Sequence, residues 1–328
     1  MNIEVSEYEK ISAFELEPIT QLCGQNIATK TYVLDSLRRY FSTYKYQEIE
    51  NKWRDNVKVD GELVGRKYFE IVSVKNQSDI ISHIKLTKQS LMMEYIKAQM
   101  QDFDFQTYLA IIEQQLDAMY DIVNESLSQM GTVEINYDIS DAMDIVQSAD
   151  ITTKDQLPLD NMDGDESIRL FLNLIDKVQS INPRKSIIIL ENIDHIVSMD
   201  EYKKVVERLQ EISRVYDIYF ILTTSLDGYV CYTPQLATGI SIFNDIIYQL
   251  PDHEHLINFV SERYPSHKEM EGESFAKIIE RIIHRIGRKG YLVTVEENVV
   301  AKILNRTLMI SDKWINEGNI PENAFLKD

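Results

Sequence analysis

Cysteine is scarce in this chain of 328 residues, in which Cys23 and Cys231 are the only two. Two cysteines cannot form a disulfide framework or a multi-cysteine metal site, and both lie in or beside apolar stretches, so we interpret them as small buried hydrophobic residues. Long apolar runs are also missing. The longest, such as Ser186 to Leu190, have the length of a strand, whereas a membrane helix needs about 20 apolar residues. The first residues lack the basic and apolar regions of a signal peptide, so these absences predict a cytoplasmic protein.

Basic residues are also few. The chain has 34 Lys and Arg but 53 Asp and Glu, which gives a net charge of −19. The deficit is uneven along the chain. Residues 30–101 carry 13 basic and 9 acidic residues, whereas residues 102–176 carry 2 basic and 17 acidic ones. A chain divided in this way can present a basic face to a polyanion while the rest of its surface stays acidic. Two ordinary solvated faces are the alternative interpretation.

The order of apolar patterns predicts an α/β fold. Short strands are expected within 1–23 and 68–74, continuous apolar strands at 186–190 and 218–223, and a further strand at 245–250. Helices are expected at 31–41, 167–179, 200–213, 253–263, 274–286 and 295–314. Apolar runs that alternate with amphipathic helices are typical of a parallel sheet covered on both faces.

A long helical arm interrupts this pattern. Residues 78 to 130 contain no proline or glycine, and their apolar residues recur at spacings of three and four, which predicts two long helices broken near 102–104. We therefore expect a discontinuous head domain (1–77 and 180–251), a helical arm domain (78–179) and a helical C-terminal extension (252–328).

The segment from Gly24 to Thr31 follows an apolar strand and opens a helix, as a phosphate-binding loop does. It matches G-x-x-x-x-G-K-[ST] except that Thr29 replaces the second glycine, while Lys30 and Thr31 keep their places. A β-branched residue there obstructs the approach of the backbone to phosphates. This predicts a sheet core that resembles the P-loop NTPases but is degenerate.

The second nucleotide motif is also altered. A P-loop enzyme places a metal-binding Asp at the end of a buried strand, commonly followed by a catalytic Glu, and here the strand ends in Glu191-Asn192. Two defects predict a protein without NTP hydrolysis and without catalytic residues. No nucleophile elbow, metalloprotease or kinase motif is present.

Binding candidates follow from charge. The basic region supplies the expected DNA contacts Lys30, Arg38, Arg39, Lys52, Arg54 and Lys58. Arg285 and Arg288 lie in a second basic stretch, which either contacts a phosphate backbone or complements the dipole at a helix end. Glu134, Asp138 and Asp141 belong to a concentration of carboxylates that either binds a hard cation such as calcium or forms an exposed acidic surface. No cofactor is otherwise required.

The order of elements resembles the long form of the Csn-two family, CRISPR-associated proteins of the type II-A spacer-acquisition module. The resemblance lies in an N-terminal α/β piece, the helical insertion and the stretch 133–138, followed by the strands Lys185 to Asn192 and Ile218 to Thr224. It covers roughly residues 1–250, and the helical tail corresponds to the long form.

The resemblance implies a function. Family members form homotetrameric rings whose basic channel threads linear double-stranded DNA from its ends. They lack nuclease and NTPase activity and act beside the CRISPR integrase pair and the effector nuclease during antiviral adaptation. Short-form members bind calcium near the arm, which would correspond to carboxylates near Asp138.

Two other functions stay open from the residues alone. Intact Lys30 and Thr31 fit an active P-loop ATPase of the AAA or ABC type. The acidic arm fits a structural adaptor that binds a basic protein partner.

Overall fold

The computed structural model describes residues 1–8, 10–42, 53, 55–128, 149–226, 228–244, 246–265, 270, 272–286, 294–308 and 320–327. The chain divides into two compact units, residues 1–76 with 184–328 and residues 77–183. Across the described ranges, no helix has both the length and the hydropathy that crossing a membrane requires.

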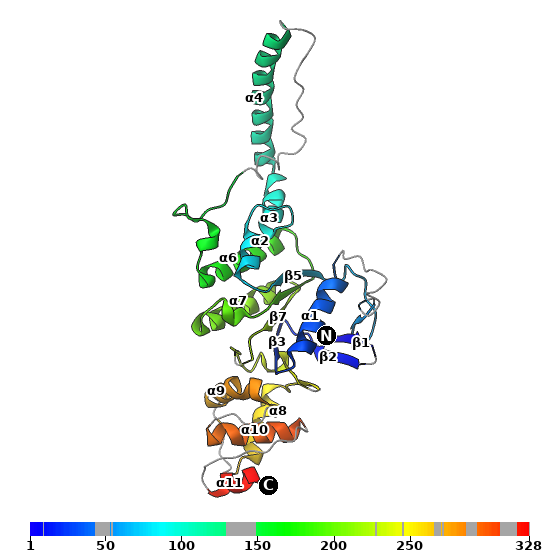
Figure 1. The fold of residues 1–328 in the computed structure, drawn as a ribbon, viewed down its shortest axis with the longest axis vertical. Coiled ribbons are helices and arrows are strands. Elements are labelled where there is room, and N and C mark those ends of the chain that lie inside the picture. The colour runs from blue at the N-terminus through cyan, green and yellow to red at the C-terminus, as the bar shows by residue number, and fades with distance from the viewer. Residues whose placement is uncertain are drawn as a thin grey trace. The chain divides into compact units, whose positions relative to one another are not determined.

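A six-stranded sheet forms the centre of the first unit (Figure 1). Its strands, in spatial order, are β5 (Glu70–Val74), β6 (Ser186–Leu190), β7 (Ile218–Thr223), β3 (Ile19–Cys23), β8 (Ile240–Phe243) and β9 (Ile247–Gln249). All neighbouring pairs are parallel except β8 with β9. The predicted mostly parallel sheet is therefore confirmed. Strands β3, β6 and β8 are buried at every position, as expected of strands that are covered on both faces.

Helices α1 (Ile27–Tyr40) and α7 (Met199–Val215) lie on opposite sides of this sheet (Figure 1). Apolar residues of α1 pack against alternate residues of β6 and β7, including Ile187, Ile189 and Ile221, while α7 contacts β7 and β3. The 3-10 helix η3 (Ile193–His195) follows β6. Both faces of the sheet are thus covered.

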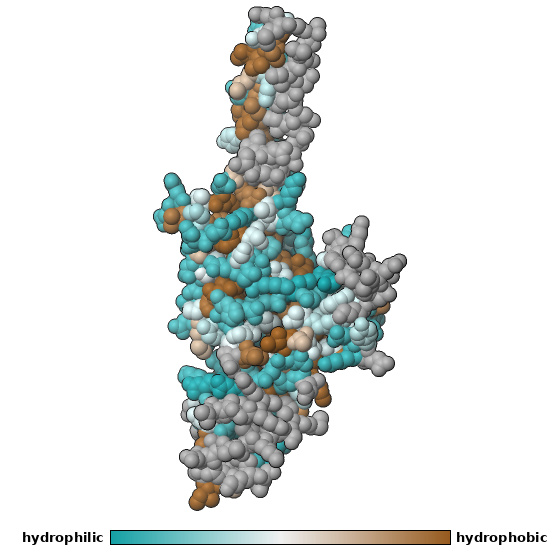
Figure 2. Space-filling model, viewed as in Figure 1, coloured by the Kyte–Doolittle hydropathy of each residue, from teal (hydrophilic) through white to brown (hydrophobic). Residues whose placement is uncertain are grey.

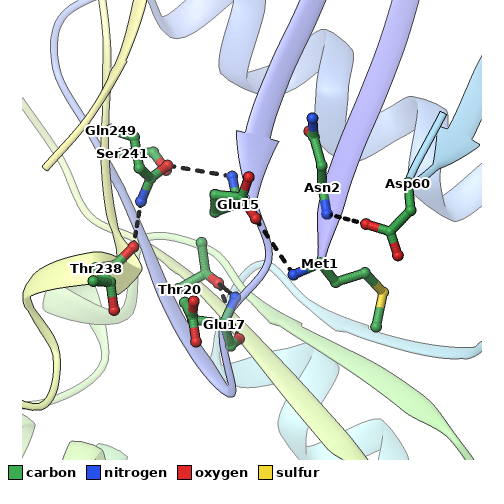
Figure 3. A network of polar contacts seen from close by, with 9 residues as sticks. All are labelled: Met1, Asn2, Glu15, Glu17, Thr20, Asp60, Thr238, Ser241 and Gln249. Carbon is green, nitrogen blue, oxygen red and sulfur yellow. Dashed lines mark hydrogen bonds and ion pairs between the residues drawn. The ribbon is translucent and has the colours of Figure 1, made fainter. Parts of the chain in front are cut away.

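A second, antiparallel sheet of three strands lies against α1. It contains β1 (Asn2–Glu7), β2 (Lys10–Glu15) and β4 (Val57–Val59), in the order β2-β1-β4. Gln249 connects it to the large sheet (Figure 3). The Gln249 side-chain oxygen accepts hydrogen bonds from the Glu15 backbone N–H at 3.2 Å and the Ser241 hydroxyl at 2.7 Å, and its nitrogen donates to the Thr238 carbonyl.

The C-terminal helices complete the first unit. They are α8 (His253–Arg263), α9 (Gly272–Ile282), η5 (Ile283–Arg285), α10 (Val295–Thr307) and α11 (Ile320–Lys327), preceded by η4 (Ala237–Gly239). Apolar residues of α8, α9 and α10 share a buried cluster with Ile240 and Ile242 of β8. The segment after residue 252 therefore builds part of the core of the same unit.

The second unit is helical in its described residues. It contains α2 (Gln77–Ile84), α3 (Leu91–Met100), α4 (Phe103–Ser128), η2 (Leu159–Asn161) and α6 (Gly164–Ile181). α6 packs against α2 and α3, and its buried Phe171 lies beside His83 of α2. The 26-residue α4 has no buried residue, and Figure 2 shows hydrophobic atoms along it.

Two expected elements differ in the structure. The region before α4 holds two helices rather than one, because the Ser90 hydroxyl accepts the Met93 N–H and begins α3 after a turn at 85–90. The strand expected at 245–250 is the short β9, and the sequence interpretation missed β8 beside it.

Candidate functional site

The segment from Gly24 to Thr31, for which the sequence predicts a degenerate phosphate loop, contains the turn between β3 and α1 and the start of α1. Gly24 has a φ of +84°, and a Cβ there would lie 2.4 Å from the Phe243 carbonyl oxygen, so only glycine fits. Asn26 caps α1 by accepting the N–H of Thr29 at 3.0 Å. The sequence thus places a helix N-terminus where a phosphate loop has one.

Polar groups of the chain itself occupy this loop. The Gln25 N–H donates to the Asn244 side-chain oxygen at 3.1 Å, and the Asn26 N–H donates to the Phe243 carbonyl at 2.9 Å. The Lys30 ammonium donates to the Gly24 carbonyl at 2.9 Å. Two backbone donors and the lysine that would contact a phosphate therefore donate to groups of the protein instead, at the ends of β3 and β8.

Lys30 is also poorly placed for DNA, because only 6% of it is exposed. Burial lowers the pKa of its ammonium, and the neighbouring Cys23 and Asp194 oppose this shift only in part. A buried lysine bonded to a carbonyl of its own loop does not reach a phosphate backbone. We therefore remove Lys30 from the expected DNA contacts.

Arg38 binds the carboxylate at the end of β6. Its guanidinium forms ion pairs with Glu191 and with Asp35, the latter at 2.6 Å, and its Nε donates to the Ser73 hydroxyl at 2.7 Å. Only 15% of the Arg38 side chain and 13% of the Glu191 side chain are exposed. The carboxylate that follows β6 is thus held in an internal ion pair, and the arginine expected to contact DNA is engaged within the fold.

The next carboxylate, Asp194, is held by the loop after β7. It accepts the Ser225 N–H at 3.0 Å and the Ser225 hydroxyl, and a Cβ at Gly228 would lie 2.5 Å from its Oδ2. Asn192 has a φ of +51°, a left-handed conformation that asparagine tolerates. No local pattern predicts the Asp194–Ser225 contact, because 31 residues separate the two.

The other DNA candidates are distributed over several elements. Arg39 lies near the end of α1 with its guanidinium 4.6 Å from the centre of the Trp53 ring. Lys58 lies on β4 opposite Glu4, and Arg285 ends η5. Lys52, Arg54 and Arg288 lie outside the described residues.

The candidate calcium ligands Glu134, Asp138 and Asp141 also lie outside the residues that the structure describes. Among the described residues, no group of three or more His, Cys, Asp or Glu side chains is arranged to hold a metal ion.

The two cysteines are buried in the first unit. Burial is the largest cause that raises the pKa of the Cys23 thiol to about 12 and that of the Cys231 thiol to about 11. Both thiols are then protonated at pH 8, and the thiolate is the reactive form. We expect no alkylation by iodoacetamide in the folded protein and two alkylated cysteines in urea, as measured by mass spectrometry. Rapid labelling of the folded protein would contradict the burial.

Two comparisons with known proteins cover nearly the whole chain. The family model described as CRISPR-associated protein Csn2 subfamily St (Csn-two above) matches residues 5–327. The crystal structure of Stu0660 of Streptococcus thermophilus is similar with a TM-score of 0.86 and 22% identity over 99% of each chain.

Other solved structures are less similar. An Smc head bound to the C-winged helix domain of ScpA has a TM-score of 0.43 and 14% identity over 78% of this chain and 98% of that one. The SMC head domain from Thermotoga maritima has a TM-score of 0.37 and 11% identity over 76% and 98%. No curated protein matches the sequence. The match over residues 5–327 places this chain in the Csn2 family of CRISPR-associated proteins.

Proposed function

We propose that the protein binds linear double-stranded DNA at its ends, without sequence preference and without cutting it, as a homotetrameric ring in the cytoplasm. Membership of the Csn2 family supports a role in type II-A CRISPR adaptation, the capture of new spacers. That membership, over residues 5–327, is the observation that carries the proposal. The partners proposed with it are the CRISPR integrase and effector nuclease proteins.

The geometry of the 24–31 loop supports a binding protein over an ATPase. We propose that it is a P-loop-like segment in which nucleotide chemistry has been lost. Its N–H groups and Lys30 bond to the chain itself, and Glu191 is paired with Arg38. A nucleotide would have to displace these contacts before it could bind to the 24–31 loop.

We accordingly expect no hydrolysis of ATP above background, in the presence or absence of linear DNA. Phosphate release by the purified protein measures this directly. Turnover that disappears in the Lys30→Ala variant would establish the ATPase alternative and contradict the proposed loss of nucleotide chemistry.

The net charge of the subunit and the exposed apolar residues of α4 both support an assembly of several copies. A subunit with a net charge of −19 provides few cationic contacts by itself, so several basic faces must combine to hold DNA. The arm helix α4 exposes large apolar residues, including Phe103 (83%), Tyr108 (69%) and Ile122 (70%), which fit a contact between copies. Light scattering that shows only monomer at micromolar concentration would contradict the ring.

DNA binding itself is tested with linear and covalently closed duplexes of equal sequence. We expect binding to the linear form only, insensitive to sequence, with a log–log salt dependence that changes by about one unit for each phosphate contact removed. Arg39→Glu should weaken binding to every linear duplex, because Arg39 lies in the basic region at the end of α1. Arg214→Glu, an equal charge change at an exposed residue at the end of α7, is the control. Equal binding of both DNA forms, or equal loss in both variants, would contradict the end-binding ring or this placement of the DNA surface.

A further inference from the structure

A pocket with a volume of about 830 Å³ lies in the first unit beside β5. We name it the β5 pocket. Its lining combines cationic and apolar side chains and consists of Arg38, Phe41, Ser42, Arg66, Lys67, Tyr68, Phe69, Glu70, Ile71, Ser73, Arg184 and Lys185. Among the described strands, β5 is at one edge of the large sheet and pairs only with β6.

The topology explains why basic residues gather there. Arg66 and Lys67 precede β5, and Arg184 and Lys185 precede β6. The two strands are parallel, with Glu70 opposite Ser186. The residues that precede each strand therefore lie close together, beside the N-terminal ends of β5 and β6. Two basic dipeptides 118 residues apart in the sequence thereby line one pocket.

The lining contains five cationic side chains and one carboxylate. Arg38 is paired with Asp35 and Glu191, and Arg184 forms two hydrogen bonds to Glu70 at 2.7 and 2.8 Å. These two arginines are therefore largely neutralised.

Two lysines of the lining have different surroundings. The Lys185 ammonium donates to the Tyr68 hydroxyl at 2.9 Å and lies 4.3 Å from the centre of that ring. Partial burial lowers the pKa of Lys185, but the Tyr68 hydrogen bond and nearby Asp217 outweigh it and raise the pKa overall, so the ammonium stays charged. Lys67 is exposed, and no ion pair joins it to another described residue. Both lysines can therefore offer positive charge to an anion.

The wall of the pocket beside Lys185 is aromatic and apolar. Phe41 and Phe69 are buried, Ile71 is half-buried, and Tyr68 is 38% exposed. A pocket of this volume with an apolar wall and a few charged groups is typical of a small-ligand site. The ligand that matches it has a flat, weakly polar part and an anionic part.

We propose that the β5 pocket binds a nucleoside 5′-phosphate unit, with the base against Tyr68, the exposed aromatic side chain of the wall, and the phosphate at Lys67 and Lys185. Aromatic side chains bind bases of any sequence by stacking, and lysines bind phosphates as point charges. The unit comes either from a free nucleotide or, resting on the proposed function, from the terminal nucleotide of a DNA strand.

Calorimetric titration of the full-length protein with dAMP tests the pocket. We expect saturable binding that weakens at least tenfold in Lys67→Glu and is kept in Lys67→Arg. Lys10→Glu is the matched control, since Lys10 is an exposed lysine on β2 outside the pocket. The proposal is overturned if dAMP does not bind, if Lys67→Glu behaves as Lys10→Glu, or if inorganic phosphate binds as tightly as dAMP. A glutamate-rich peptide that binds where dAMP does not would likewise overturn it, in favour of a protein ligand.

Duplex DNA distinguishes the two sources. If the strand end supplies the nucleotide, a linear duplex with 5′-phosphates binds more tightly than one with 5′-hydroxyls, and dAMP competes with it. If the two duplexes bind equally while dAMP still binds, the ligand is a free nucleotide. Failure of the unmodified protein to bind any linear duplex would contradict the proposed function and leave the dAMP result standing. If only dAMP failed to bind, the proposed ligand of the β5 pocket would be contradicted, and the proposed DNA binding would not be affected.

Discussion

Replacing Gly24 by alanine is expected to lower the stability of the protein by about 3–5 kcal/mol. The new Cβ would lie 2.4 Å from the Phe243 carbonyl oxygen and 2.7 Å from the Phe243 nitrogen, both on the backbone of β8. A left-handed conformation costs a non-glycine residue roughly 1–3 kcal/mol, and overpacking adds typically about 1–3 kcal/mol. Thermal unfolding followed by circular dichroism should show a midpoint lower by about 10 °C, from a shift of about 2–4 °C per kcal/mol.

Gly61→Ala is the control for this variant. Gly61 has a φ of +82°, close to that of Gly24, but no atom lies within 4 Å of the position that its Cβ would take. It should therefore show the conformational cost of about 1 kcal/mol without the clash. Equal midpoint shifts in the two variants would show that β8 does not constrain the loop.

Removing Arg38 is expected to cost about 2–4 kcal/mol of stability. Arg38→Met leaves the mostly buried Glu191 carboxylate beside Asp35 without its counter-charge. Breaking a buried pair from one side typically costs about 3–5 kcal/mol, and the remaining exposure of these side chains reduces that figure. Replacing both partners, in Arg38→Met with Glu191→Leu, should recover most of the loss, as a double-mutant cycle in urea unfolding would measure.

The Arg184–Glu70 pair provides the comparison. It is also an arginine–glutamate ion pair, but its side chains are 39% and 38% exposed, so its coupling should stay below about 1 kcal/mol. A cycle that gives the same coupling for both pairs would contradict the role of burial. Reversal of Arg38 would also perturb the fold, which makes Arg39 the cleaner position for testing DNA contact.

The sequence predicted the elements whose signal is local. The strands at 186–190 and 218–223 and the helix at 253–263 have the predicted bounds, because continuous apolar runs and a capped amphipathic pattern mark them. β8 was missed because four residues with a buried serine in their midst give neither a long apolar run nor a clear alternation.

The site depends on contacts that no local pattern contains. The spacing at Gly24 predicts a phosphate loop, but the partners of the N–H groups of Gln25 and Asn26 are Asn244 and Phe243, more than 210 residues away. Lys30 has the spacing of a phosphate-binding lysine, and its burial became evident only with the surrounding strands in place. Similarly, Arg38 counts as positive charge in the sequence, whereas Glu191 neutralises it in the fold.

The order of strands in the large sheet determines when the chain can fold during its synthesis. β3 pairs with β7 and β8, so Ile19 meets Phe220, and Gln21 meets Ile240. Until β7, which ends at Thr223, has left the ribosome, β3 is an apolar strand with both edges open, and its second edge stays open until β8 follows; open edges favour aggregation and chaperone binding. The helices between residues 77 and 183 contact one another and emerge earlier, so they can fold first. A nascent chain that stops before β7 should therefore contain a folded helical unit joined to an unfolded N-terminal segment.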